Sequence, residues 1–192
     1  MPQPVQPDPE LESLSRIQVL AALGITAVLL LLVVQVWRFL GAPVMLPLSW
    51  SWRHLWIGVA LGAGITLSSG AVYRLWPAYR ASADGYLTMI LSPLLWLDLI
   101  WLGLLPGASE ELLFRGLLLP AFGLDWVGLI LSSLCFGAMH FSGRPQWPYV
   151  VWASVIGVAL GGSAIATGSL LVPLVAHVTT NIVSGSLWKL MS

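Results

Sequence analysis

Charged residues are scarce in this sequence. Only 8% of its 192 residues are Asp, Glu, Lys or Arg, whereas 58% are hydrophobic. Soluble domains carry about 25% charged residues, so this composition excludes an ordinary water-soluble domain and indicates a protein that resides in the lipid bilayer. The eight basic and eight acidic residues balance, and no basic run is present. The sequence therefore predicts membrane lipids as surroundings and no nucleic acid as a partner.

Cysteine is almost absent as well. Cys135 is the only one, and it lies in an apolar stretch. A single cysteine excludes an internal disulfide and a cysteine-rich metal cluster, and its neighbours predict a position in the protein core. A secretory signal is also lacking, because residues 1–16 are proline-rich and acidic instead of positively charged. We expect these residues to form a flexible tail before an uncleaved hydrophobic segment.

Long hydrophobic runs dominate the rest of the chain. A helix needs about 20 apolar residues to cross the roughly 30 Å of hydrocarbon in a bilayer. Apolar runs of about this length cover residues 17–39, 54–75, 86–105, 125–141, 149–167 and 169–189. A shorter segment from Glu110 to about Phe122, bracketed by prolines, predicts a partial span packed inside the bundle. The predicted fold is an all-α, multi-pass transmembrane bundle of about seven helices, which makes the chain an integral membrane protein.

Glu110, Glu111 and Arg115 are ionisable residues within this apolar sequence. A charge in the middle of a bilayer costs several kcal/mol, so such residues usually face a bundle interior and serve a function. Glu111 and Arg115 are four residues apart and share a helix face, which predicts an ion pair, while Glu110 points about 100° away. An unpaired, desolvated carboxylate suits a general base, and Glu110 is the candidate. Asp98 is also expected to find a partner, either Arg115 or a histidine.

Two further pairs share a helix face at a spacing of four residues. Phe136 precedes His140, and His177 precedes Asn181. The imidazole and the carboxamide of the second pair can each donate a hydrogen bond to a developing oxyanion. Each motif alone is equally typical of helix packing, with Asn181 joining helices and the ion pair locking them. Together they predict a buried hydrolytic site.

The three motifs in this order resemble the CAAX protease and bacteriocin-processing family of intramembrane proteases, which includes the type II CAAX prenyl endopeptidase. The family pattern is E-E-x-x-x-R, then F-x-x-x-H, then H-x-x-x-N, and it is met at residues 110–115, 136–140 and 177–181. The resemblance covers roughly residues 86–189. It implies a catalytic transmembrane bundle at 86–192, preceded by two N-terminal transmembrane helices within residues 17–85 and by the tail at 1–16.

The resemblance also implies roles for the site residues. Glu110 and His140 would activate a water for attack on the peptide carbonyl of a membrane-associated peptide or protein, and His177 and Asn181 would stabilise the oxyanion. Glu111, Arg115 and Phe136 would support the site.

Two alternatives remain open from the sequence. The predicted mechanism needs no cofactor, but Glu110, His140 and His177 form a donor set that is chemically sufficient for a divalent metal such as zinc, which would make the chain a metalloprotease. The second alternative is a non-enzymatic assembly or chaperone-like membrane factor in which the polar cluster is structural.

Overall fold

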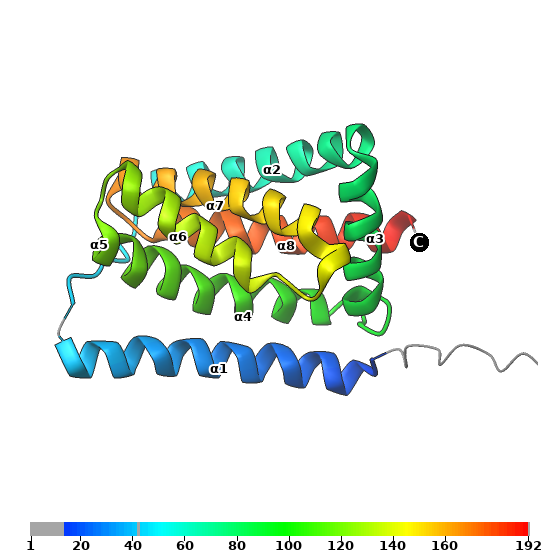
Figure 1. Ribbon diagram of the computed structural model, residues 1–192, viewed down its shortest axis with the longest axis horizontal. Coiled ribbons are helices and arrows are strands. Elements are labelled where there is room, and N and C mark those ends of the chain that lie inside the picture. Colours follow the sequence, from blue (N-terminus) through cyan, green and yellow to red (C-terminus); the bar gives the residue numbers. More distant parts are fainter. Residues whose placement is uncertain (1–13, 42, 192) are drawn as a thin grey trace, which may run out of the picture.

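The computed structural model describes residues 14–41 and 43–191 of the chain. Regular structure in these residues is entirely helical, which confirms the predicted all-α class (Figure 1). The α-helices are α1 (Arg16–Gly41), α2 (Trp52–Leu75), α3 (Pro77–Leu91), α4 (Asp98–Glu111), α5 (Leu119–Phe122), α6 (Trp126–Met139), α7 (Trp147–Thr167) and α8 (Leu171–Met191). A π-helical segment, η1 (Leu112–Leu118), joins α4 to α5, and a 3-10 turn, η2 (Arg144–Gln146), precedes α7. The predicted tail at 1–16 lies largely outside the described residues.

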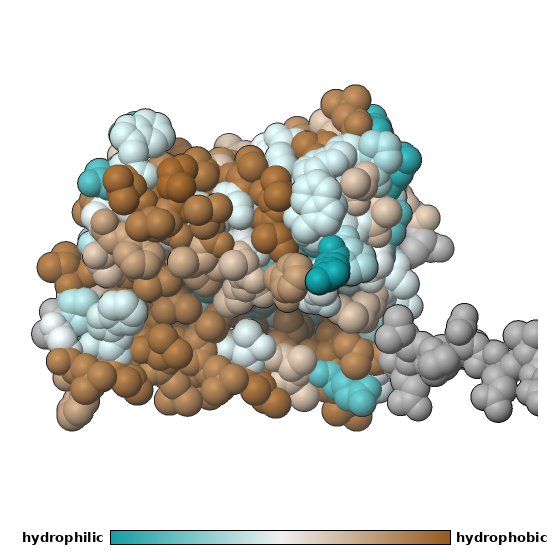
Figure 2. Space-filling view, viewed as in Figure 1, coloured by the Kyte–Doolittle hydropathy of each residue, from teal (hydrophilic) through white to brown (hydrophobic). Residues whose placement is uncertain are grey.

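Four helices are long and apolar enough to cross a membrane, namely those at Arg16–Gly41, Trp52–Leu75, Arg144–Thr167 and Leu171–Met191. Apolar side chains cover much of the flank of the bundle, and hydrophilic residues gather at the end where α3 lies (Figure 2). An apolar flank between more polar ends is the arrangement that suits a bilayer.

The segment that carries Glu110 differs from its prediction. Residues 98–122 form one continuous helical unit, α4–η1–α5. The prediction of separate helices at 86–105 and 110–122 was therefore wrong. The chain breaks instead between α3 and α4, where Pro93 stands, whereas Pro106 lies inside α4. Pro106 has no N–H to offer the Leu102 carbonyl four residues earlier, and Asn181 Nδ2 of α8 donates to that carbonyl over 3.4 Å. A neighbouring helix thus makes the internal proline tolerable.

Helix α3 runs across one end of the bundle, and the other long helices run along its axis (Figure 1). The start of α1, the end of α2, the α6–α7 connection and the end of α8 share the α3 end of the bundle. Five basic residues therefore lie at that end, and two lie at the other. The five are Arg16, Arg74, Arg80, Arg144 and Lys189, and the two are Arg38 and Arg53.

Small residues allow close helix contacts on α2 and α7. A Cβ on Gly62 of α2 would lie 2.6 Å from the Ala176 carbonyl of α8, and a Cβ on Gly157 of α7 would lie 3.0 Å from Ser133 of α6. Gly64 and Gly162, which lie nearby on the same two helices, have nothing within 4 Å of such a Cβ. Only one face of each glycine-rich stretch is therefore a packing surface.

Two other predictions were wrong. Cys135 is exposed on α6 and is not a core residue. Asp98 pairs with neither Arg115 nor a histidine, but with Arg16 of α1, through contacts of 2.7 Å to Nε and 2.8 Å to Nη2. This bidentate pair ties α1 to the first residue of α4.

Candidate active site

The predicted ion pair is present and completely buried. Arg115 Nη1 lies 2.6 Å from Glu111 Oε1, and both side chains have no exposed surface. Arg115 Nη2 also donates to the Gly157 carbonyl of α7 over 3.2 Å. The arginine belongs to the π-helical segment η1, a wide turn that is often found at functional sites. The pair thus joins α4, η1 and α7 in the interior.

His177 extends this pair to α8. Its Nδ1 lies 2.8 Å from Glu111 Oε1, the oxygen that also accepts from Arg115. An ionised carboxylate can only accept, so Nδ1 carries the proton of this hydrogen bond, and Nε2 of a neutral ring is left as an acceptor. The sequence missed this contact because it joins residues 66 positions apart.

His140 is held in a similar way by its own helix. Its Nδ1 lies 2.9 Å from the Phe136 carbonyl, which can only accept, so Nδ1 is the donor here as well. His140 ends α6 and is partly buried. Both histidines therefore use Nδ1 for support and keep Nε2 for the site.

The Phe136 ring lies at the centre of the three motifs. The Arg115 guanidinium carbon is 4.3 Å from its centroid, within range of a cation–π contact. The His140 and His177 rings lie 4.9 Å and 5.8 Å from it. The structure thus brings together one residue or more from each predicted motif, and Phe136 is the contact that they share.

Glu110 lies beside this cluster with a free oxygen. The residue is only 7% exposed, and its Oε2 is buried without a hydrogen-bond partner in the described part of the chain. Glu110 makes no direct hydrogen bond with His140 among these residues. A buried carboxylate oxygen without a protein partner is a ready acceptor for a water or a substrate N–H.

Asn181 lies one turn beyond His177 on α8. Its one hydrogen bond within the described residues is the contact of Nδ2 with the Leu102 carbonyl at 3.4 Å. It makes no hydrogen bond with the Glu111–His177 pair. A carboxamide nitrogen has two N–H groups, so the second remains for another acceptor.

Tyrosine rings continue the cluster toward α3. The Tyr149 ring of α7 lies 6.0 Å from the His140 ring, and the Tyr86 ring of α3 lies 4.6 Å from Tyr149. The sequence analysis missed both residues. No local pattern marks them, because their place beside His140 depends on how α3 crosses the bundle.

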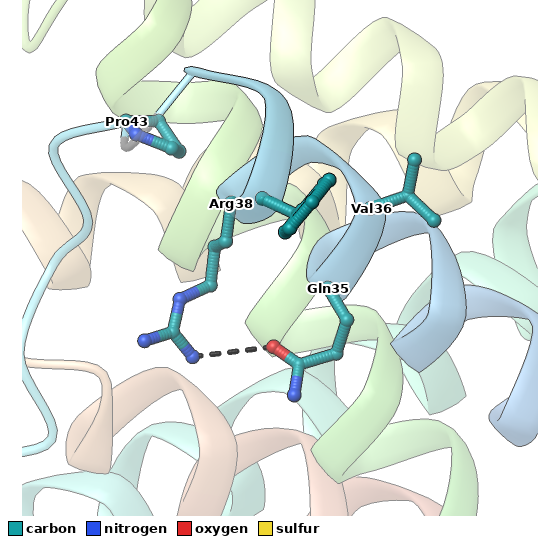
Figure 3. Close-up of a pocket in the computed structure, with 5 residues that line it drawn as sticks. Gln35, Val36, Arg38 and Pro43 are labelled. Carbon is teal, nitrogen blue, oxygen red and sulfur yellow. Dashed lines mark hydrogen bonds between the residues drawn. The ribbon is translucent and has the colours of Figure 1, made fainter.

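A metal site does not emerge from the described side chains. No group of three or more His, Cys, Asp or Glu residues among them has an arrangement that could hold a metal ion, and this includes Glu110, His140 and His177. A surface hollow of about 730 Å³ lies elsewhere, at the C-terminal end of α1 (Figure 3). Arg38 and Gln35, which line it, share a hydrogen bond of 3.3 Å and contribute nothing to the polar cluster.

Comparison with known proteins agrees with the motif geometry. Residues 91–183 match the family described as type II CAAX prenyl endopeptidase Rce1-like. This part of the chain is therefore similar to the Rce1-like family. It begins with the last residue of α3, ends within α8 and contains all three motifs. Helices α1 and α2 and nearly all of α3 precede it.

Two curated proteins are similar to the chain, and both are described as uncharacterized. YpbD of Bacillus subtilis is 34% identical over 125 residues, which are 65% of this chain and 64% of YpbD. A 24.3 kDa protein of Escherichia coli is 28% identical over 163 residues, which are 80% of this chain and 73% of that protein. The matched part thus spans less than two thirds of YpbD. No solved structure matches the chain.

Proposed function

We propose that the chain is an intramembrane endopeptidase that hydrolyses peptide bonds of membrane-associated substrates. The observation that carries this proposal is the convergence of Arg115, His140 and His177 around the Phe136 ring, beside the unpartnered oxygen of Glu110. The similarity of residues 91–183 to the Rce1-like family supports the same activity.

In the proposed reaction, Glu110 and His140 activate a water. The Glu110 carboxylate takes a proton from the water, and His140 Nε2 accepts its second hydrogen and orients it. The water oxygen then bonds to the peptide carbonyl carbon, whose oxygen becomes an oxyanion. When the C–N bond breaks, the proton held by Glu110 passes to the leaving amine. Water is thereby divided between the new carboxyl and amino termini.

His177 and Asn181 are the proposed oxyanion donors. His177 can donate from Nε2 only as a doubly protonated ring, because Nδ1 already donates to Glu111. Two carboxylates and one guanidinium leave the buried cluster with a formal charge of −1, so a protonated His177 would bring it to zero. Asn181 would use the N–H that is not directed at Leu102.

Cleavage by the purified protein in lipid vesicles tests the proposal. The substrates are quenched fluorescent peptide libraries, one unmodified and one carrying a C-terminal prenyl chain. We expect cleavage that survives exhaustive chelation. Loss on chelation with recovery on adding zinc would favour the metal-dependent protease instead. A folded protein that cleaves neither library would favour the non-enzymatic assembly or chaperone-like factor.

A further inference from the structure

Helix α3 brings an aromatic face to the His140 end of the candidate site. Tyr79 and Tyr86 are seven residues apart and therefore share one face of the helix. Tyr79 is only 6% exposed. Its ring lies 6.2 Å from Tyr149 in a stacked arrangement, and the Tyr86 ring lies 4.6 Å from the same tyrosine. Tyr149 is thus held between the two rings of α3 and the His140 ring, which is 6.0 Å away.

The Tyr86 side chain is close enough to Glu110 to feel its charge. Burial raises the pKa of Tyr86 to about 12, and the nearby Glu110 carboxylate raises it further in the same direction. A phenol whose pKa lies this high stays protonated at neutral pH. Tyr86 makes no hydrogen bond with another described residue, so its hydroxyl is a free polar edge on an otherwise apolar wall.

Polar contacts on either side fix the position of α3. Ser82 Oγ donates to Gln146 Oε1 of η2 over 2.6 Å, and the Tyr73 hydroxyl of α2 donates to Asp84 over 2.7 Å. Residues 77–90 of α3 precede the Rce1-like segment at 91–183. Most of α3 thus lies outside the matched residues, and its Tyr86 ring contacts Tyr149, whose ring lies beside His140.

We propose that α3 is the substrate-selecting element of the site, and that Tyr86, packed against Tyr149, walls a subsite beside His140 for an apolar substrate side chain. This inference rests on the proposed protease function. The wall is built from ring faces, so an acidic side chain placed there would lose its hydration and would face the nearby Glu110 carboxylate without gaining a cationic partner. Tyr86 acts on the substrate and on access to the site, and the bond-breaking steps remain with Glu110 and His140.

Thiol labelling tests the wall without any need for activity. Glu110→Cys is introduced together with Cys135→Ser, and modification by a charged methanethiosulfonate is timed in lipid vesicles. Adding Tyr86→Ala is expected to raise the rate at least tenfold, because water then reaches position 110. Tyr86→Phe keeps the ring, so its labelling rate is expected to stay within twofold of the rate with Tyr86 intact. An unchanged rate with Tyr86→Ala, or no labelling at all, overturns the proposal.

Cleavage of the peptide libraries tests selection. Tyr86→Ala is expected to raise the kcat/KM ratio of tryptophan-containing over alanine-containing peptides at least tenfold, since the subsite is then larger. Tyr86→Phe is expected to change this ratio less than threefold. Wild-type cleavage with an unmoved ratio in Tyr86→Ala overturns the selecting role and leaves the protease function standing. Absence of cleavage in every folded variant would defeat the protease function and, with it, the selecting role. This holds even if the labelling shows that Tyr86 shields position 110.

Discussion

His177 Nδ1 and Glu111 Oε1 meet at 2.8 Å, although the two residues are 66 positions apart in the sequence. The same oxygen accepts from Arg115 at 2.6 Å, so a single carboxylate oxygen joins α4, η1 and α8. A shared, fully buried acceptor fixes the direction of the His177 ring far better than packing alone. In the proposed reaction, Glu111 would position the His177 ring, and Glu110 would act as the base.

Arg115→Met is expected to destabilise the protein strongly. Methionine keeps much of the side-chain volume but leaves the Glu111 carboxylate buried without its cation, a change that costs about 3–5 kcal/mol in known cases. The free energy of unfolding in detergent micelles measures the effect. Arg38→Met is the matched control, because Arg38 is exposed and bonds only to Gln35 of its own helix. Equal stability of the two variants would contradict a buried ion pair.

Gly157→Ala is expected to push α7 away from α6 and to weaken the hold on Arg115. The added methyl would lie 3.0 Å from Ser133, and the Gly157 carbonyl is the one that accepts from Arg115. Overpacking of this kind costs about 1–3 kcal/mol. Gly162→Ala on the same helix meets nothing within 4 Å and should be neutral or slightly stabilising. A thermal unfolding midpoint lowered equally in both variants would argue against this packing.

Arg16 and Asp98 are expected to act as one unit. Asp98→Asn and Arg16→Gln each break the contacts of 2.7 and 2.8 Å that attach α1 to α4. Each single variant should lower the thermal unfolding midpoint, and the double variant should lower it by less than the sum of the two shifts. Additive shifts would mean that the two side chains do not interact in the bilayer.

The α3 end of the bundle is expected to face the cytoplasm. Five basic residues lie at that end and two at the other, and cytoplasmic loops carry the excess of Lys and Arg. In a Cys135→Ser background, Val44→Cys between α1 and α2 should react with a membrane-impermeant maleimide added to intact cells, and Ser142→Cys between α6 and α7 should not. The reverse labelling pattern would invert this orientation.

Helix type and the three motifs could be predicted from the sequence because both depend on short-range spacing. Apolar runs define the long helices, and a spacing of four residues places Glu111 and Arg115 on one face. Proline was a poor guide to helix ends. Pro106 lies inside α4 and cannot donate an N–H to the Leu102 carbonyl. Asn181, on a helix far away in the sequence, donates to that carbonyl instead.

The tertiary parts of the site could not be predicted. The contact of Glu111 with His177 and the approach of Tyr86 to Tyr149 both depend on how helices far apart in the sequence pack. The partner of Asp98 was wrong for the same reason, since Arg16 belongs to a helix that precedes the motif region. Spacing rules describe one helix at a time, and these contacts join two.

Glu110→Gln tests the central claim most directly. The substitution keeps the size of the side chain and its capacity to accept hydrogen bonds, but removes the base, so cleavage of the peptide libraries should fall about 100-fold or more. Arg38→Gln, a charge change on the exposed side of α1, should leave cleavage unchanged. Both variants should unfold at the wild-type temperature. Wild-type cleavage by a folded Glu110→Gln protein would contradict the account.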